Sequence, residues 1–401
     1  MRMHSPTPKP ALLATFWFGI QALWGALLGI SLQLRTTQLA PDHAVIAYGQ
    51  LAAAGALTAV IVQLVMGPLS DRLRAGGTDR RWFFITGALL GCIGIFGFYL
   101  AQTFPMLIGA LVFLQIGMNI AIGPYQAIIP DYMPSAQAGG ASAWMAALQS
   151  LGNAAGAVCA VLLSGTPVLL AGVLAFLVVV TGAITVLHIA RLVPRAIGRA
   201  SGVVPYSLSR AAIDLFISRA VLWIGFYTVL GYMFFYVHDT LHIANAVQSS
   251  GIVILIFTVF GAAGAALSAR PADAMDRRVV VNGSSGIFMI GLISFVLVRD
   301  ERLMYAAAAI AGTGWGGFLA ADWALGCSIL PPGIMATAMG IWNIAVAGPQ
   351  IIAPALTTIM VLSVHVDKAV APLYALSLAT LEALVGALWI WRLPAPGQKD
   401  R

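Results

Sequence analysis

Apolar residues in this chain fall into long runs that are separated by short polar segments. Most runs reach the roughly 20 residues that a helix needs to cross the hydrocarbon core of a bilayer. They lie near residues 11 to 34, 44 to 69, 82 to 101, 105 to 129, 139 to 163, 167 to 190, 220 to 237, 247 to 267, 279 to 298, 303 to 330, 333 to 363 and 369 to 391. The pattern predicts an all-α membrane protein with twelve transmembrane helices.

Composition supports a lipid environment. Hydrophobic residues make up 60% of the chain and charged residues only 9%, whereas soluble domains contain roughly 25% charged residues. The first apolar run is longer than the core of a signal peptide and has no clear small-residue cleavage site. We therefore expect it to be retained as the first helix.

The distribution of Lys and Arg predicts the topology. If both termini are cytoplasmic, 17 of the 21 basic residues, Arg219 among them, fall on the cytoplasmic side. This asymmetry follows the positive-inside rule. We expect a multi-pass protein of the cell (inner) membrane with both termini in the cytoplasm. Because the basic residues are scattered between apolar runs, their net charge of +7 does not indicate a nucleic-acid partner.

A polar stretch divides the predicted helices into two groups of six. The expected domains are an N-terminal bundle over residues 1–190, a cytoplasmic linker over 191–219 and a C-terminal bundle over 220–401. The end of the linker, SLSRAAIDLFISRA, is amphipathic enough to lie along the membrane interface, where arginines meet anionic headgroups.

The two groups carry a faint internal repeat. At an offset of 197 residues, Asp79-Arg80-Arg81 aligns with Asp276-Arg277-Arg278, and Pro134 aligns with Pro331. The agreement of both matches with the helix count favours a duplicated fold of two pseudo-symmetric six-helix bundles.

The segment GPLSDRLRAGGTDRR between the second and third predicted helices resembles the cytoplasmic loop motif of the major facilitator superfamily. The resemblance implies that the fold is that of a secondary transporter, with rocking of two halves around a midplane cavity. It also implies that Gly67 allows close helix approach, while Asp71, Arg72, Arg80 and Arg81 form charge contacts that gate the cycle. The alternative is a solvated turn with topology-setting arginines.

Three further segments are similar to the sucrose-type and glycoside-pentoside-hexuronide branch of cation-coupled sugar symporters. They are AVIVQLVMGPLSDRLR, NIAIGPYQAIIPDYMP, and AADWALGCSILP followed by GIWNIAVAGPQIIAP. The chain departs from the sodium-coupled members of that branch, because helix 2 has no acidic residue and helix 4 has none before Asp131. We therefore expect protons, not sodium, as the coupling ion.

Two carboxylates lie inside apolar runs, Asp322 near the middle of helix 10 and Glu382 near the middle of helix 12. A carboxylate at membrane depth is costly and usually faces a cavity, a partner or a proton path. Both residues are therefore candidates for coupling, and the alternative for each is a hydrogen-bonded structural carboxyl.

Amide and aromatic side chains within the predicted helices are candidates for substrate binding. They are Gln21, Trp24, Gln115, Asn119, Gln126, Gln149, Asn153, Trp323, Trp342 and Asn343, and Tyr227, Trp315 and Gln350 have the same chemistry. Rings stack on the apolar faces of sugars and amides bond to hydroxyls, so the set suits a neutral hydroxylated solute. The alternative is hydrogen bonding between helices and anchoring of tryptophans at the interface.

The leading hypothesis is proton-coupled uptake of a sugar or similar neutral solute by a monomer. Two alternatives are proton-driven efflux of a drug or metabolite, and a transporter-like assembly or sensor protein that moves nothing. An enzyme is not expected, because no nucleophile and base pair, nucleotide loop or metal-ligand cluster appears, and no cofactor or metal is predicted.

These hypotheses predict different behaviour in proteoliposomes that contain only this protein. Solute flux is expected, and it would eliminate the sensor hypothesis. Uptake that depends on an imposed inward proton gradient is expected for the symporter. Export of the solute in exchange for protons that move inward would support the exporter.

Overall fold

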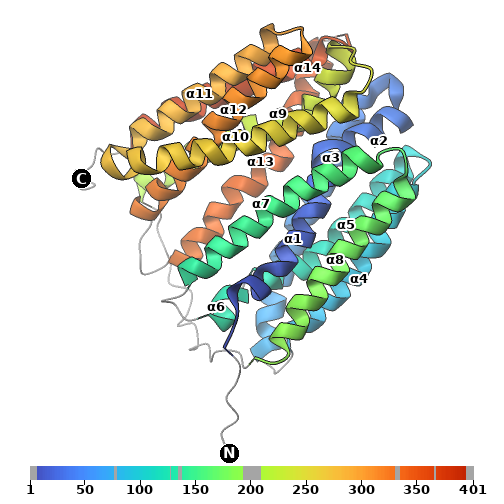
Figure 1. Ribbon diagram of the computed structural model, residues 1–401, viewed down its shortest axis with the longest axis vertical. Coiled ribbons are helices and arrows are strands. Elements are labelled where there is room, and N and C mark those ends of the chain that lie inside the picture. The colour runs from blue at the N-terminus through green and yellow to red at the C-terminus, as the bar shows by residue number, and fades with distance from the viewer. Residues whose placement is uncertain are drawn as a thin grey trace, which may run out of the picture. The chain divides into compact units, whose positions relative to one another are not determined.

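The computed structural model describes residues 7–75, 79–126, 128–133, 138–192, 209–329, 335–364 and 367–393. Within these ranges every regular element is helical (Figure 1). Backbone groups have no water to bond to in hydrocarbon, so spanning segments that satisfy them internally are required.

The first half of the chain contains eight α-helices in its described part. They are α1 (Pro10–Ala26), α2 (Leu32–Leu39), α3 (Ala44–Ala75), α4 (Arg81–Leu100), α5 (Phe104–Tyr125), α6 (Ile128–Tyr132), α7 (Ala138–Leu163) and α8 (Pro167–Ile189). A π-helical turn, Leu27–Ser31, joins α1 and α2 into one span, and a 3-10 turn, Pro41–His43, precedes α3.

The second half contains six α-helices in its described part. They are α9 (Arg210–Phe235), α10 (Ala246–Ala274), α11 (Arg277–Leu297), α12 (Glu301–Ile329), α13 (Met335–Val364) and α14 (Ala371–Trp389). A π-helical turn, Tyr236–Thr240, extends α9, and a 3-10 turn, Ile390–Arg392, extends α14.

Length and hydropathy make 10 of the described helical stretches candidate membrane spans, and two shorter apolar helices, Ala147–Leu163 and Gly348–Ser363, lie within α7 and α13. Each of the twelve predicted apolar runs thus has a helical counterpart. The all-α membrane architecture predicted from the sequence is confirmed.

The chain divides into two compact units. Residues 1–40 and 54–204 form one unit, and residues 41–53 and 205–401 form the other. The first turns of α3 therefore belong to the second unit. Most of the predicted linker lies outside the described residues, but α9 begins at Arg210. The segment expected at the membrane interface is, from that residue on, the start of a spanning helix.

In the first unit, α1 packs against α7 and α8, and α4 packs against α5 and α8 (Figure 1). Glycines stand at the crossings. A methyl group on Gly156 of α7 would collide with the carbonyl oxygen of Ala22 in α1. A Cβ at Gly117 of α5 would lie 2.6 Å from the backbone nitrogen of Gly91 in α4, and a Cβ at Gly94 of α4 would lie 2.5 Å from the Cα of Leu114 in α5. Small residues let these backbones approach closely.

The second unit uses glycines at the equivalent positions. A Cβ at Gly291 of α11 would lie 2.5 Å from the Cβ of Ala311 in α12, and a Cβ at Gly314 of α12 would collide with the backbone nitrogen of Phe288. All four residues are 197 positions after their counterparts in α4 and α5. The repeat found in the loops therefore extends to the contacts between helices.

The same repeat sets the start of two helices. Asp79 Oδ1 accepts a hydrogen bond of 2.9 Å from the backbone of Arg81, and Asp276 Oδ1 accepts one of 3.0 Å from the backbone of Arg278. Each aspartate also pairs with the guanidinium of the same arginine. The hydrogen bonds from the guanidinium of Arg278 lower the pKa of the Asp276 carboxyl from its ordinary value. An anionic residue at a helix N-terminus is favourable because it satisfies unpaired backbone donors.

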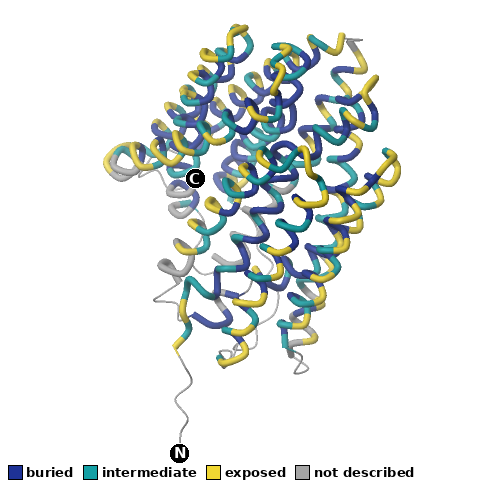
Figure 2. Tube along the Cα trace, turned by 45° about the vertical axis from the view of Figure 1, so that its right-hand side comes forward, coloured by how far each residue is buried: buried dark blue, intermediate teal, exposed yellow. Residues whose placement is uncertain are grey.

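Buried and exposed residues alternate along the helices (Figure 2). The exposed stripes are themselves apolar: Leu162, Leu267 and Leu297 each have more than two thirds of their surface exposed, at 74%, 71% and 73%. A soluble monomer rarely exposes apolar stripes of this kind to water, whereas they are favourable in contact with lipid. The burial pattern therefore agrees with the bilayer as solvent.

The packing predicts that substitution of two glycines of α5 changes the stability of the fold by different amounts. Gly117→Val should destabilise the fold by about 1–3 kcal/mol, because the new side chain meets backbone of α4. A Cβ at Gly109 of the same helix meets no described atom within 4 Å, so Gly109→Val should change stability little. Thermal unfolding of both variants in detergent measures the difference, and equal unfolding temperatures would contradict this packing.

Candidate functional site

A buried ion pair joins α9 to α12. The guanidinium of Arg219 donates through its Nη1 to Asp322 Oδ2, and the two side chains are 7% and 1% exposed. Removing two charges from water is costly, and mutual attraction compensates only when both partners remain. The second carboxylate oxygen, Asp322 Oδ1, is buried and has no hydrogen-bond partner among the described residues. One acceptor of this carboxylate is therefore available.

An aromatic cluster surrounds the pair. The guanidinium carbon of Arg219 lies 5.6 Å from the ring centre of Trp223, one turn further along α9. Trp223 packs edge-on against Trp315 of α12, whose ring stacks on Phe226 with a centroid separation of 4.4 Å. The indole Nε1 of Trp223 is buried without a described acceptor. The cluster thus combines apolar ring faces with an unused donor and an unused acceptor.

The same face of α9 carries a third polar group. Gln350 of α13 donates a 2.8 Å hydrogen bond from Nε2 to the hydroxyl of Tyr227. Arg219, Trp223, Phe226 and Tyr227 are spaced by four, three and one residues, which places them along one side of the helix. One helix face thus presents a cation, aromatic rings and a hydroxyl that is held by an amide.

Asp322 lies beyond the middle of its helix, where the sequence analysis placed it, and stands seven residues before Ile329, the last residue of α12. Its equivalent in the first unit, 197 residues earlier, is Tyr125 at the end of α5. Tyr125 is fully buried and donates a 2.6 Å hydrogen bond to the carbonyl of Leu13 in α1. Equivalent positions therefore carry a neutral phenol in one half and a paired carboxylate in the other.

Glu382 of α14 is the second buried carboxyl group. Its Oε2 accepts a 3.2 Å hydrogen bond from the hydroxyl of Thr228 on α9, and its Oε1 is buried without a described partner. A close approach at Gly225 brings the two helices together, since a Cβ there would lie 2.9 Å from the carbonyl oxygen of Ala379. Both candidate coupling residues thus contact α9, from different neighbouring helices.

In the first unit, three amides form a chain. Gln63 of α3 donates from Nε2 to Asn119 Oδ1 at 2.7 Å, and Asn119 Nδ2 donates to Gln115 Oε1 at 2.9 Å. Gln115 and Asn119 are both buried. A separate contact joins Gln21 of α1 to Gln149 of α7, with 3.4 Å between Nε2 and Oε1. The structure therefore brings four of the predicted amides into two separate pairs and adds Gln63 to one of them.

Three other predicted binding residues, whose side chains are described, form none of these contacts. Gln126 follows the last residue of α5 and is exposed, Asn153 is exposed on α7, and Trp24 is half-buried. The side chains of Trp323, Trp342 and Asn343 lie outside the described residues.

The predicted gating segment contains a second buried ion pair. Arg80, which precedes α4, has its Nε 3.2 Å from Asp131 Oδ2, and both side chains are under a tenth exposed. Its Nη1 also donates to Ser70 Oγ at 3.3 Å and to the carbonyl of Pro124 at 3.4 Å. One guanidinium therefore connects the ends of α3, α5 and α6.

The remaining gating residues differ from Arg80. Arg81 pairs with Asp79 at 2.5 Å, with both side chains about a third exposed. At Gly67 a Cβ would meet no described atom within 4 Å, so no close approach restricts this position here. The side chains of Asp71 and Arg72 lie outside the described residues.

Sequence reasoning missed three of these groups. Arg219 was counted among the cytoplasmic charges that set topology, whereas it is buried against Asp322. Trp223 and Gln63 were not identified as candidates. The signal for Arg219 was present: the apolar periodicity of α9 begins well before it, at Ala211, so the arginine interrupts a helix instead of preceding one.

Comparisons with known proteins agree on one family. The sequence profile of the Major Facilitator Superfamily matches residues 11–354. No curated protein sequence matches the chain.

Several solved structures share the fold. A POT family peptide transporter in an auto-inhibited form has a TM-score of 0.75 at 12% identity, covering 98% of each chain. A D-xylose-proton symporter has a TM-score of 0.71 at 16% identity, covering 98% of this chain and 99% of its own. A variant of the nucleoside transporter NupG has a TM-score of 0.71 at 14% identity, covering 96% of this chain and 100% of its own. At these identities the likeness shows the fold alone.

The buried pair predicts strong coupling between two substitutions. Arg219→Met or Asp322→Leu alone should each cost about 3–5 kcal/mol, because each leaves a buried charge uncompensated. The double variant should recover most of that loss. Thermal or denaturant unfolding in detergent measures the stability of the two single variants and the double variant. Arg302→Gln at an exposed position on α12 serves as the control. Additive effects of the two single substitutions would show that the pair does not form.

Proposed function

This chain belongs to the Major Facilitator Superfamily, and we propose that it is a proton-coupled secondary transporter that takes up a sugar or a similar neutral solute. It is a multi-pass membrane protein and a transporter, not an enzyme. We place it in the inner membrane with cytoplasmic termini, on the distribution of its basic residues, and expect it to work as a monomer.

One observation carries the proposal: among the described residues, Arg219 is the cation that pairs with the buried carboxylate of Asp322 inside the second unit. A buried pair of this kind has two distinct states. With Asp322 ionised, the pair ties α9 to α12. With a proton on Asp322 the ionic attraction to Arg219 is lost, and only a hydrogen bond still joins the two helices at this point. Proton binding therefore changes a contact between helices, which is the requirement for coupling a proton to a conformational step.

The free oxygen of the carboxylate supports this role. Because Asp322 Oδ1 has no described hydrogen-bond partner, a proton can bind there without first displacing the guanidinium. Glu382 enters the proposal as a second protonatable group, since it contacts the same helix α9 through Thr228. No described cation pairs with Glu382, so burial is compensated by a hydroxyl only.

The chemistry around the pair supports a neutral hydroxylated solute. The ring of Trp223, which is only partly buried, offers apolar surface, and its indole Nε1 offers a donor that has no described acceptor. The amide of Gln350, which is bonded to Tyr227 of α9, can donate to a hydroxyl and accept from one. The segments that resemble the sucrose-type and glycoside-pentoside-hexuronide branch favour the same substrate class.

We propose that the first unit contributes a conformational lock. Arg80 holds Asp131, Ser70 and the carbonyl of Pro124 together at one end of this unit. Because one guanidinium joins three segments, movement of any of them breaks at least one of these contacts, which suits a gate.

A screen by thermal shift identifies the substrate class first. Purified protein is heated with sugars, nucleosides, amino acids and organic acids, because a ligand that binds the folded state raises the apparent stability. Stabilisation by sugars or related polyols is expected. Stabilisation by charged solutes only would contradict the proposed substrate class.

Asp322→Asn tests the coupling role with the solute found in the screen. In proteoliposomes this variant should lose substrate-driven proton uptake, falling to the level of protein-free liposomes, while solute exchange at equal concentrations continues. The reason is that an amide cannot take up the proton but still bonds to Arg219. Glu301→Gln, at the other end of α12, is the matched carboxylate control and should keep proton uptake. Normal proton uptake by Asp322→Asn would overturn the assignment.

A further inference from the structure

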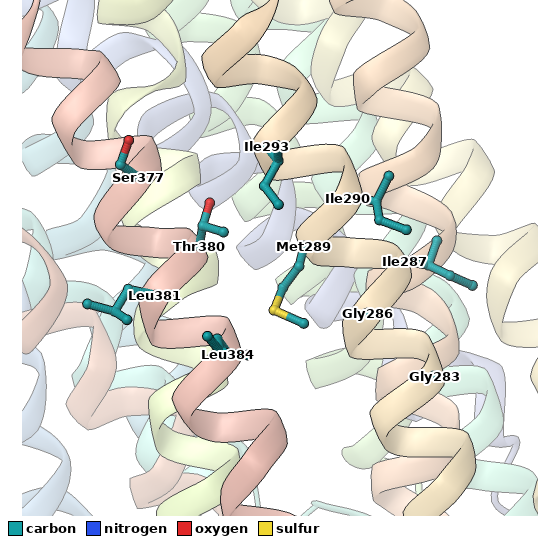
Figure 3. Close-up of a pocket in the computed structure, with 10 residues that line it drawn as sticks. All are labelled: Gly283, Gly286, Ile287, Met289, Ile290, Ile293, Ser377, Thr380, Leu381 and Leu384. Atoms are coloured by element: carbon teal, nitrogen blue, oxygen red, sulfur yellow. The ribbon is translucent and has the colours of Figure 1, made fainter.

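A groove runs between α11 and α14 on the lipid-facing side of the second unit. Its volume is about 700 Å³, within the range of roughly 300–1,000 Å³ that is typical of small-molecule pockets. The lining residues are Gly283, Gly286, Ile287, Met289, Ile290, Ile293, Ser377, Thr380, Leu381 and Leu384. Figure 3 shows the side chains of Met289 and Thr380 between the two helices.

The depth of the groove comes from two glycines. A Cβ at Gly283 or at Gly286 would meet no described atom within 4 Å. These positions differ from Gly291 on the same helix, where the backbone of α12 leaves no room. Packing inside the unit therefore does not require glycine at Gly283 or Gly286. The absence of a side chain at these two positions leaves space on the surface.

The two polar side chains that line the groove, Ser377 and Thr380, use their hydroxyl donors within α14. Ser377 Oγ donates to the carbonyl of Leu373 at 2.8 Å, and Thr380 Oγ1 donates to the carbonyl of Leu376 at 2.9 Å. Both hydroxyls are thus satisfied within α14. The remaining surface is aliphatic, with Ile290 and Leu381 each more than half exposed. An apolar, flexible occupant fits this surface.

One end of the groove leads to arginines. Because α11 and α14 run antiparallel, the start of α11 lies beside the end of α14, and Arg278 Nη1 donates to the carbonyl of Leu393 at 2.7 Å. Arg392 is exposed, and no described carboxylate pairs with it. At 1.5 Å per residue, it lies about 12 Å along the helix from the last lining residue, Leu384.

Two tryptophans mark this end as a membrane interface. The guanidinium carbon of Arg392 lies 4.2 Å from the ring centre of Trp389, whose Nε1 donates to Asp214 at 2.9 Å. Trp391 is half exposed. Tryptophans are enriched where hydrocarbon meets headgroups. Of the carboxylates nearby, Asp276 pairs with Arg278, and Asp214 accepts the hydrogen bond of the neutral indole of Trp389.

We propose that the groove and Arg392 together bind one anionic phospholipid, with an acyl chain between α11 and α14 and the phosphate at the guanidinium. The aliphatic lining matches the chain, and the exposed cation at the interface matches the charge of the headgroup. A helix from a second copy would fill the groove equally well, but it would bring no negative charge to Arg392. This site is separate from the ion pair proposed for transport.

Native mass spectrometry of the full chain in detergent tests the proposal, with a palmitoyl-oleoyl phosphatidylglycerol probe and the corresponding phosphatidylcholine as a neutral comparison. We expect one phosphatidylglycerol to be retained in preference to phosphatidylcholine. Arg392→Gln should weaken phosphatidylglycerol binding about fivefold and leave phosphatidylcholine unchanged. Gly286→Leu should weaken binding roughly tenfold, since it displaces methylene groups of the chain from the groove.

Matched variants keep the result interpretable. Gly172→Leu on α8 also places a side chain in open space, and Arg302→Gln removes an exposed cation elsewhere; both should bind phosphatidylglycerol as the wild type does. Gly283→Leu provides a second variant if Gly286→Leu does not give folded protein. Equal retention of the two lipids, unchanged binding by both glycine variants, or a dimer that the glycine variants abolish would overturn the proposal.

Discussion

The bilayer imposes the constraint on which the rest of this structure depends. Hydrocarbon offers no hydrogen bonds to the backbone, so each span must be a helix, and it offers no hydrophobic advantage to helix association. Close contact must then come from surface shape. Glycines at Gly94 and Gly117, and at Gly291 and Gly314, let neighbouring backbones touch directly. The same geometry in both halves explains why these positions repeat while most surrounding residues differ.

Polar side chains in this environment need partners, and the partners organise the units. The amides Gln63, Asn119 and Gln115 satisfy one another between α3 and α5. Arg80 connects three segments around Asp131. Each contact fixes the relative position of helices within its unit. Polar groups that are satisfied in one arrangement only are therefore well suited to define distinct conformational states.

The two halves differ most where the repeat would predict the same group. Tyr125 and Asp322 occupy equivalent positions on α5 and α12, and each contacts the first helix of its own half. The phenol forms a neutral contact with Leu13, whereas the carboxylate forms an ionic contact with Arg219. At this position the shared scaffold thus carries a charge in one half only. This asymmetry supports the proposal that proton coupling resides in the second unit.

The sequence by itself determined the membrane class, the helices and the repeat, because hydrophobic length, charge asymmetry and small-residue spacing are local properties. It also identified Asp322 and Glu382, since a carboxylate in an apolar run is conspicuous in any arrangement. Only the tertiary structure assigned their partners, Arg219 and Thr228, which lie more than 100 positions away. Arg219 shows the reason: it stands within α9, where the sequence alone does not decide whether a guanidinium meets headgroups or a buried acid. The packing of α9 against α12 decided which.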